Sequence, residues 1–269
     1  MRAWTPPGGT LGAIVAEAAK RVEALRSRTA ELAAQARDVA PPPAFAAALR
    51  GSHVALIAEV KRRSPSKGWI NPGLPAAEQA AAYRAGGAAA ISVLTEPAHF
   101  GGSTADLIAV RRQVELPALK KDFHVDPVQL LEAKAAGASA ALLIVRALSH
   151  DALQRMADAA SELDLECLIE VRDAEELERA LAIGATVIGV NSRNLETLAI
   201  DSAAAERLFG QIPDTIVVVA ESAVASREDV ERVARAGADA VLVGSAVSAA
   251  RDPAAAVRQL AGVTRSARG

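Results

Sequence analysis

The stretch AGADAVLVG, at Ala236–Gly244, contains the pattern that decides the fold. A helix-like segment ends at glycine, alanine follows, and the chain then enters an apolar run typical of a buried strand. Three further copies read AGGAAAISVL, AAGASAALLI and AIGATVIGV, at Ala85–Leu94, Ala135–Ile144 and Ala182–Val190. The glycines of the four copies lie 50, 47 and 53 residues apart, at Gly87, Gly137, Gly184 and Gly237. Because one βα unit takes about 25 residues, this spacing predicts two units per repeat.

The segments between the copies contain the additional strands that this spacing requires. We predict eight strands, at Ala55–Val60, Ala89–Leu94, Ala118–Lys120, Ala140–Val145, Glu166–Val171, Thr186–Val190, Ile216–Ala220 and Ala240–Val243. Amphipathic, alanine-rich helices are predicted between them, among others at Pro127–Ala136, Ala152–Leu163, Ala174–Ile183 and Arg227–Ala236. Eight strands alternating with helices favour a single α/β domain folded as a (β/α)8 TIM barrel. A doubly wound open sheet is the alternative.

A helical segment precedes the first predicted strand. Its main part is Leu11–Arg37, rich in Ala, Glu and Arg, and three prolines at 41–43 separate it from a short predicted helix at Ala44–Leu49. We therefore expect residues 1–50 to form an N-terminal helical extension, 51–263 the barrel and 264–269 a tail. The sequence leaves open whether the extension covers the bottom or side of the barrel or closes over the rim where the strands end.

Composition and charge exclude several classes of protein. Apolar residues make up 51% of the 269 residues, enough for a substantial core, and a net charge of −2 argues against a nucleic-acid-binding protein. Cys167 is the only cysteine and the four histidines have no ligand-like spacing, so we expect no metal site. No apolar stretch approaches the roughly 20 residues of a transmembrane helix, and the N-terminus lacks a signal pattern. We expect a cytoplasmic protein that binds neither membrane nor nucleic acid.

Charged and polar side chains stand at the ends of five predicted strands. The interior strand of a parallel sheet should be almost purely apolar, yet ALIAEVKRRSPS at Ala55–Ser66 ends with several charges. Four other strands end in LKKDF, LIEV, VNSR and VAES, starting at Leu119, Leu168, Val190 and Val219. The carboxyl ends of barrel strands share one face, which is where barrel enzymes have their active sites. We therefore expect these side chains to converge on a single site.

The polar groups expected at this face suit acid–base chemistry. They are the cations Lys61 and Lys121, the carboxylates Glu59, Glu170 and Glu221, and the neutral groups Asn191 and Ser222. Lysines and carboxylates in one partly desolvated cup shift each other's pKa, which is the usual way to obtain an acid and a base near neutral pH. Any single carboxylate of this set could equally well be a catalytic group or the partner in a structural ion pair. The whole set on successive strands favours an active site.

A phosphate site is expected beside these groups. Gly244 and Ser245 follow the eighth predicted strand and open onto a predicted helix, where barrels often bind phosphate with backbone N–H groups. Ser64 and Arg63 in the first loop would add side-chain donors. Arg146 lies at the end of the fourth strand, and for this residue we favour a salt bridge to a neighbouring carboxylate over a role in the site.

Six motifs together closely resemble those of indole-3-glycerol-phosphate synthase. They are EVKRRSPSKG, SVLTEPAHFGGS, KKDFHVDPVQ, LIEVRDAEEL, GVNSRNLETL and VAES, starting at Glu59, Ser92, Lys120, Leu168, Gly189 and Val219. The resemblance runs in order from about Ala44 to Val263, and that family also carries an N-terminal helical extension. It implies a (β/α)8 barrel and a decarboxylating ring closure in tryptophan biosynthesis. The substrate, 1-(2-carboxyphenylamino)-1-deoxyribulose 5-phosphate, would become indole-3-glycerol phosphate with loss of carbon dioxide and water.

The resemblance also implies roles for individual residues. Lys121 matches the general acid that protonates the substrate ketone, and Glu170 matches the catalytic carboxylate. Glu59 and Lys61 match the acidic–basic pair of the first strand, and how the two lysines share the acid roles stays open. The remaining positions match residues that hold the substrate (Asn191, Ser222, Arg193, Glu221 and Phe100) or its phosphate (Ser64, Gly244 and Ser245). No metal or organic cofactor is implied, and association with other enzymes of the tryptophan pathway is left open.

One departure from the family pattern leaves alternatives open. Ala223 follows Glu221 and Ser222, where the family usually has glycine, and a methyl group there disfavours a left-handed backbone conformation close to the phosphate. Gly244–Ala250 also lacks the bulkier residues that the family commonly has. The alternatives are a paralogue that makes indole outside tryptophan supply, another phosphate-binding barrel such as a sugar-phosphate isomerase, and a non-catalytic barrel that binds a phosphorylated ligand or scaffolds partner enzymes.

Overall fold

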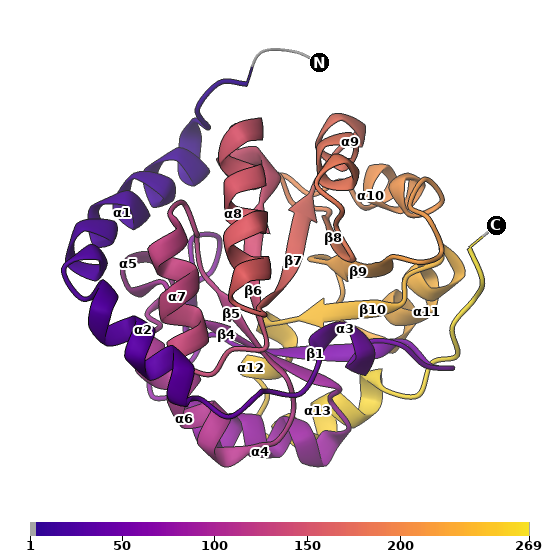
Figure 1. The fold of residues 1–269 in the computed structure, drawn as a ribbon. Coiled ribbons are helices and arrows are strands. Elements are labelled where there is room, and N and C mark those ends of the chain that lie inside the picture. The colour runs from indigo at the N-terminus through magenta and orange to yellow at the C-terminus, as the bar shows by residue number, and fades with distance from the viewer. Residues whose placement is uncertain (1–3, 269) are drawn as a thin grey trace.

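Eight parallel strands form a closed barrel in the computed structural model, which describes residues 4–268 (Figure 1). They are β1 (Ala55–Val60), β4 (Ala90–Leu94), β5 (Ala118–Lys121), β6 (Ala140–Ile144), β7 (Glu166–Val171), β8 (Val187–Asn191), β9 (Val217–Glu221) and β10 (Ala240–Val243). Each strand pairs with the next, and β10 pairs with β1, where Ala55 lies opposite Ala240. The TIM barrel predicted from the repeat is therefore confirmed, and the open sheet is excluded.

Helices alternate with the strands around the outside of the barrel. They are α4 (Ala76–Gly86), α6 (Thr104–Gln113), α7 (Pro127–Ala135), α8 (His150–Glu162), α9 (Ala174–Ala182), α10 (Ser202–Phe209), α11 (Arg227–Arg235) and α13 (Pro253–Leu260). Asp126 and Ser226 each form a capping box at the start of α7 and α11. All four repeat glycines have positive φ, from 74° to 98°, because the chain must reverse between helix and strand there.

Short elements follow several strands at their carboxyl ends. After β1 comes a hairpin of β2 (Arg63–Ser64) and β3 (Gly68–Trp69), and after β4 comes α5 (Pro97–Phe100). A single 3-10 turn, η1 (Val145–Ala147), follows β6, and α12 (Ser245–Ser248) follows β10. These elements lie at the carboxyl ends of the strands, so they shape the mouth of the barrel.

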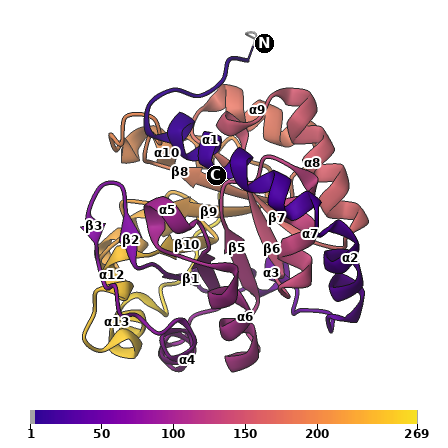
Figure 2. The same cartoon turned by 90° about the vertical axis from the view of Figure 1, so that its left-hand side faces the viewer.

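Over residues 4–50 the N-terminal extension contains three helices, α1 (Gly9–Arg26), α2 (Thr29–Asp38) and α3 (Phe45–Ala48). The single predicted helix over Leu11–Arg37 is thus wrong in one respect, because the chain leaves the helix at Ser27 and Arg28. In Figures 1 and 2 α2 lies beside α7 on the side of the barrel. The amides of Phe45 and Ala46 donate to Glu166 at the start of β7, over 2.6 and 2.8 Å, so α3 lies at the bottom.

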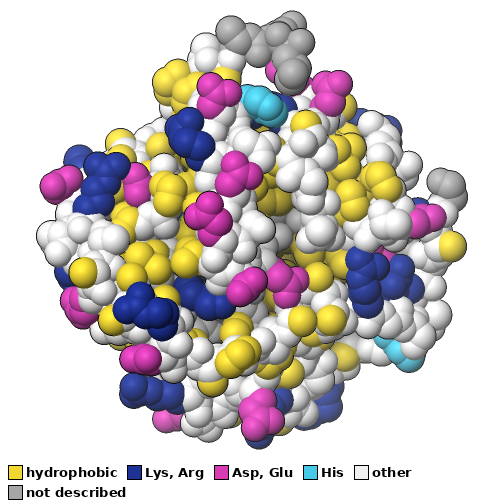
Figure 3. All heavy atoms as spheres, viewed as in Figure 1, with side chains coloured by type: hydrophobic (Ala, Val, Ile, Leu, Met, Phe, Trp, Pro, Cys, Tyr) yellow, Lys and Arg dark blue, Asp and Glu magenta, His cyan; other side chains and the backbone are white. Residues whose placement is uncertain are grey.

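The core consists mainly of small and branched apolar side chains, as a chain with only 3% aromatic residues requires. On the face drawn in Figure 3, positive and negative side chains are interspersed, so that this face presents no extended field of one sign. Within residues 4–268, none of the helices combines the length and the hydropathy that crossing a membrane requires.

Candidate active site

A cavity of about 460 Å³ opens at the carboxyl ends of the strands. The structure brings all the predicted site residues except Arg63 to its lining: Glu59, Lys61, Ser64, Phe100, Lys121, Glu170, Asn191, Arg193, Glu221, Ser222, Gly244 and Ser245. The polar groups at the strand ends are largely buried, with Glu59, Glu170 and Glu221 each 3% exposed. The cavity is thus a partly dry cup with charged groups on its floor.

Two lysines and three carboxylates form the floor of this cup. Lys61 Nζ lies 2.8 Å from Glu59 Oε1. Lys121 Nζ lies 3.9 Å from Glu59 Oε2 and 3.8 Å from Glu221 Oε2, so it sits between two acidic groups without touching either closely. This leaves the Lys121 ammonium hydrogens available to a ligand in the cavity.

The charges on the floor decide which groups are ionised. Burial alone would raise the pKa of Glu59, but Lys61 and Lys121 outweigh that effect and lower it, so Glu59 is a carboxylate. Burial alone would lower the pKa of Lys121, but Glu59, Glu221 and Glu170 outweigh it and raise the pKa above its usual value. Lys121 therefore carries its proton at neutral pH.

Glu221 is the exception among the carboxyl groups. Burial, and next the nearby charge of Glu170, raise its pKa well above the usual range. Glu221 Oε1 and Glu170 Oε2 are both buried without a hydrogen-bond partner in the described structure. A carbon atom on Gly189 would come within 2.0 Å of Glu221 Oε1, so only glycine at position 189 leaves room for this side chain.

Asn191 connects Glu170 to the loop after β9. Its Nδ2 donates to Glu170 Oε1 over 3.1 Å. Its Oδ1 accepts from Ser222 Oγ and from the amide of Arg193, both over 2.9 Å. This network fixes the amide orientation, so Asn191 holds Glu170 by one carboxylate oxygen and leaves the other without a partner in the described structure.

Position 244 requires glycine for a steric reason that the sequence does not show. A carbon atom there would lie 2.3 Å from Glu59 Oε1 and 2.5 Å from Lys61 Nζ. The glycine at the end of β10 thus makes space for the ion pair at the end of β1. Ser245 begins α12, whose first amides have no carbonyl partner within the helix.

The first loop contributes Ser64 and Lys67 to the cavity. Ser64 is buried, and its Oγ accepts from the amide of Lys67 over 3.3 Å. Arg63, expected as a phosphate donor, instead places its guanidinium 5.4 Å from the centre of the Trp69 ring and donates to the carbonyl of Ala98. Lys67, in the hairpin of β2 and β3, is a second cation of this loop that lines the cavity besides Lys61, and it lies in the same EVKRRSPSKG motif.

An apolar wall faces the charged floor, and Phe100 is its one residue that the sequence analysis named. Phe100 and Phe123 have ring centres 6.0 Å apart, and Leu94, Leu142, Ile144 and Leu242 also line the cavity. Leu11 and Ile14 of α1 line it as well, so the extension reaches the rim in addition to the side and bottom of the barrel. Their spacing of three residues predicts a buried helical face but not the partner of that face.

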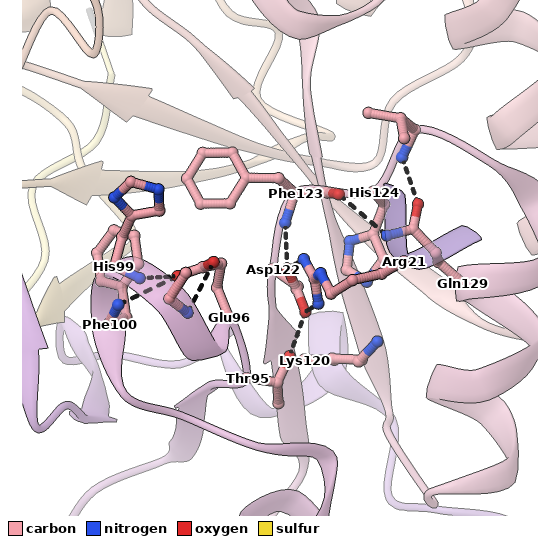
Figure 4. Close-up of polar contacts among 12 residues, drawn as sticks. Arg21, Thr95, Glu96, His99, Phe100, Lys120, Asp122, Phe123, His124 and Gln129 are labelled. Atoms are coloured by element: carbon pink, nitrogen blue, oxygen red, sulfur yellow. Dashed lines mark hydrogen bonds and ion pairs between the residues drawn. The ribbon is translucent and has the colours of Figure 1, made fainter. Parts of the chain in front are cut away.

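Asp122, directly after Lys121, anchors α1 to this wall (Figure 4). Arg21 of α1 binds it with two hydrogen bonds of 2.7 and 3.0 Å, and Thr95 Oγ1 donates over 2.8 Å. Nearby, Glu96 accepts from the amides of His99 and Phe100, which holds α5 in place. These contacts tie the extension and α5 to the end of the strand that carries Lys121.

Two further expectations can be compared with the structure. Arg146 forms the predicted salt bridge, with its Nη2 3.0 Å from Glu196 Oε1. Ser222 and Ala223 both have left-handed conformations, with φ of 64° and 52°, so the methyl group of Ala223 does not prevent the conformation that favours glycine. Among residues 4–268, no three His, Cys, Asp or Glu side chains are grouped to hold a metal ion.

Comparisons with known proteins place the chain beside members of one enzyme family. The family model for indole-3-glycerol phosphate synthase matches residues 11–260. The chain is 53% identical over 234 residues to the indole-3-glycerol phosphate synthase of a Nocardioides species, covering 87% of this chain and 90% of that protein. It is 51% identical over 239 residues to the protein of the same name from Streptomyces griseus, covering 89% and 86%.

A solved structure shares the fold alone. Thiamine phosphate pyrophosphorylase from Pyrococcus furiosus aligns with a TM-score of 0.57 at 19% identity, over 77% of this chain and 93% of its own. Barrels of this architecture support many chemistries, so the function has to be argued from the site.

Proposed function

This chain belongs to the indole-3-glycerol phosphate synthase family and is a carboxy-lyase of tryptophan biosynthesis, and we propose how its cavity residues divide the work. The substrate is 1-(2-carboxyphenylamino)-1-deoxyribulose 5-phosphate. Its aromatic carbon attacks its own ketone, carbon dioxide leaves, and water then leaves to give indole-3-glycerol phosphate.

Lys121 acts as the general acid of ring closure. The observation that carries this role is the position of Lys121 Nζ, 3.9 and 3.8 Å from carboxylate oxygens of Glu59 and Glu221. The negative charge nearby, above all that of ionised Glu59, keeps the ammonium protonated, and neither oxygen is close enough to occupy its hydrogens. One hydrogen can therefore be donated to the ketone oxygen as it becomes an alkoxide. Removing such a donor typically costs roughly 10²–10⁴ in rate.

Glu170 and the Glu59–Lys61 pair act on the later steps. Decarboxylation needs only a sink for an electron pair, which the substrate's own iminium supplies. Dehydration then needs a group that removes a proton and a group that protonates the leaving hydroxyl. Glu170, whose Oε2 has no partner in the described structure, is placed to accept a proton or stabilise positive charge. Lys61, already paired with ionised Glu59, engages the substrate carboxylate or assists dehydration.

The remaining cavity residues hold the substrate. Phe100 packs against the aromatic ring, and Asn191, Ser222, Arg193 and Glu221 support the hydroxyls and the carboxylate. Ser64, Gly244 and Ser245 bind the phosphate, with Lys67 as the nearby cation in the lining. The protein works in the cytoplasm, and other enzymes of the tryptophan pathway are candidate partners.

The test is the rise in fluorescence when purified protein is mixed with the carboxyphenylamino-deoxyribulose phosphate, because the indole product is emissive. We expect turnover in the native protein. In Lys121→Ala, kcat should fall by about 10³-fold while circular dichroism stays unchanged. Glu170→Gln should also be severely impaired. Near-normal turnover in Lys121→Ala would remove this lysine from the acid role, and a folded but inactive native protein would favour a non-catalytic, ligand-binding barrel.

A further inference from the structure

We propose that Arg232 is a positioning residue that holds the Ser222–Ala223 turn in its left-handed conformation and so compensates for the alanine at position 223. This inference rests on the proposed function in one respect, namely that this turn borders the substrate phosphate. It concerns a residue of α11, outside the set of cavity-lining side chains.

The turn has an intrinsic energetic problem. Ser222 and Ala223 are consecutive residues other than glycine with φ of 64° and 52°, a conformation that brings Cβ too close to the following carbonyl oxygen. Both residues line the cavity, so a relaxation of this turn would change the shape of the site. A stable left-handed pair therefore needs contacts that favour it over the extended alternatives.

Two side chains provide such contacts from opposite sides. From within the barrel, Asn191 Oδ1 accepts from Ser222 Oγ over 2.9 Å. From α11, Arg232 Nη2 donates to the carbonyl oxygen of Ala223 over 3.3 Å. The first contact fixes the start of the turn, and the second fixes the direction of its carbonyl group.

Arg232 is itself held in place. Its Nη2 lies 3.2 Å from Asp229 Oδ1, and its Nη1 forms an ion pair with Glu206 of α10. Asp229 in turn accepts from the amides of Ala225 and Ser226, over 3.0 and 3.1 Å. One guanidinium therefore braces the loop after β9 against two helices, with a planar fork that a lysine cannot reproduce.

The position of Arg232 also argues against a direct catalytic role. It approaches the turn at the backbone carbonyl, and neither it nor its partners Glu206 and Asp229 line the active-site cavity. Its expected effect is on the affinity for the phosphate end of the substrate, through the turn, and hardly on the chemical steps at Lys121.

The experiment is a double-mutant cycle of Arg232→Ala and Ala223→Gly, measured by substrate turnover in full-length protein. Glycine adopts positive φ without steric cost, so Ala223→Gly should make the turn independent of its support. We expect Arg232→Ala to raise KM about fivefold, equivalent to ~1 kcal/mol, with kcat within twofold. In the Ala223→Gly background the same substitution should change KM less than twofold.

Two control variants separate bracing from simple charge. Arg235→Ala removes the same charge from an exposed position of α11 and should leave KM unchanged. Arg232→Lys keeps the charge but loses the planar fork, so it should still raise KM. If its KM equals that of the native protein, only the positive charge of Arg232 matters and the bracing role is wrong. Equal KM increases in both backgrounds, or no increase in either, would overturn the proposal.

A readout without turnover keeps this proposal distinct from the proposed function. The free energy of unfolding, measured in urea for the same four proteins, should show that Arg232→Ala destabilises the native background more than the Ala223→Gly background. Coupling in unfolding with no turnover in the native protein would retain the brace and reject the enzyme function. Turnover in the native protein without coupling in either measurement would retain the enzyme function and reject the brace.

Discussion

At the scale of single residues, Gly244 lies where the backbone of β10 comes closest to the ion pair of β1. We predict that Gly244→Ala displaces Glu59 or Lys61, because the new carbon would meet both at 2.3 and 2.5 Å. The expected results are a loss of kcat/KM of at least tenfold and a loss of about 1–3 kcal/mol in the free energy of unfolding, as in other overpacked sites. Steady-state turnover and urea unfolding measure the two effects.

The matched control is Gly210→Ala. Gly210 follows α10 with a φ of −66°, and a carbon atom there would meet nothing within 4 Å. Alanine at this position should leave turnover unchanged and leave stability equal or slightly higher. Equal effects of the two substitutions would mean that the space around Gly244 has no special role.

Glu176 makes stability depend on pH. It is 6% exposed at the start of α9, and burial raises its pKa from 4.5 to about 7. Below pH 4.5 this group is protonated in both the folded and the unfolded state, so it does not lower the free energy of unfolding. Between pH 4.5 and 7 the unfolded state ionises first, so stability falls as pH rises, and the loss is complete above 7.

We predict that Glu176→Gln removes this pH dependence. Glutamine keeps an oxygen that can accept from the amide of Arg172, as Glu176 Oε2 does over 2.8 Å. Relative to the native protein, the free energy of unfolding of the variant should rise by roughly 2–3 kcal/mol between pH 5 and pH 8. Urea unfolding at the two pH values measures it, and a difference that stays constant with pH would contradict the prediction.

At the scale of elements, α1 is fastened to β5 by Arg21 and Asp122. Asp122 is 1% exposed and Arg21 about one-third exposed, so removal of the arginine leaves a buried carboxylate with only Thr95 and a backbone amide. We predict that Arg21→Met lowers the free energy of unfolding by about 2–3 kcal/mol, less than the roughly 3–5 of a fully buried pair. It should also lower kcat, because Asp122 is adjacent to Lys121.

Arg26→Met provides the control on the same helix. Arg26 also pairs with an aspartate, Asp126, over 2.7 Å, but its side chain is 59% exposed. An exposed pair of this kind contributes about 0–1 kcal/mol, so this variant should keep the stability and turnover of the native protein. If both variants behaved alike, burial of Asp122 would not explain the effect.

At the scale of the whole molecule, the two ends of the barrel have separate tasks. The C-terminal segment returns to the bottom, where Arg265 and Arg268 both pair with Asp239, just before β10, and Asp239 is 3% exposed. We predict that deleting residues 265–269 costs roughly 3 kcal/mol of stability, because Asp239 loses both cations. Turnover of the folded variant should stay within twofold of the native value, since the site lies at the opposite end of the barrel. A folded but inactive variant would show that the two ends are coupled.

Much of the site could be predicted because barrel geometry is regular. A glycine and an apolar run recur with the period of two βα units, and the carboxyl ends of parallel strands must meet on one face. Glu59, Lys121, Glu170, Asn191 and Glu221 each lie within one residue of the end of a predicted strand, so strand position and residue type were enough to bring them together. Local periodicity and chemical type are properties of the chain itself, which is why the sequence alone determined the barrel, the rim and the acid–base character of the cup.

The tertiary structure decided what depends on distances between remote residues. It decided that Glu59 and Lys121 are ionised while the pKa of Glu221 is raised, because burial and neighbouring charges set the balance between them. It also decided where α1 breaks, that Arg21 reaches Asp122, and that Gly244 makes room for Glu59. The contacts of Arg21 with Asp122 and of Gly244 with Glu59 join segments far apart in the chain, and no local pattern specifies which atoms closure of the barrel brings within contact distance.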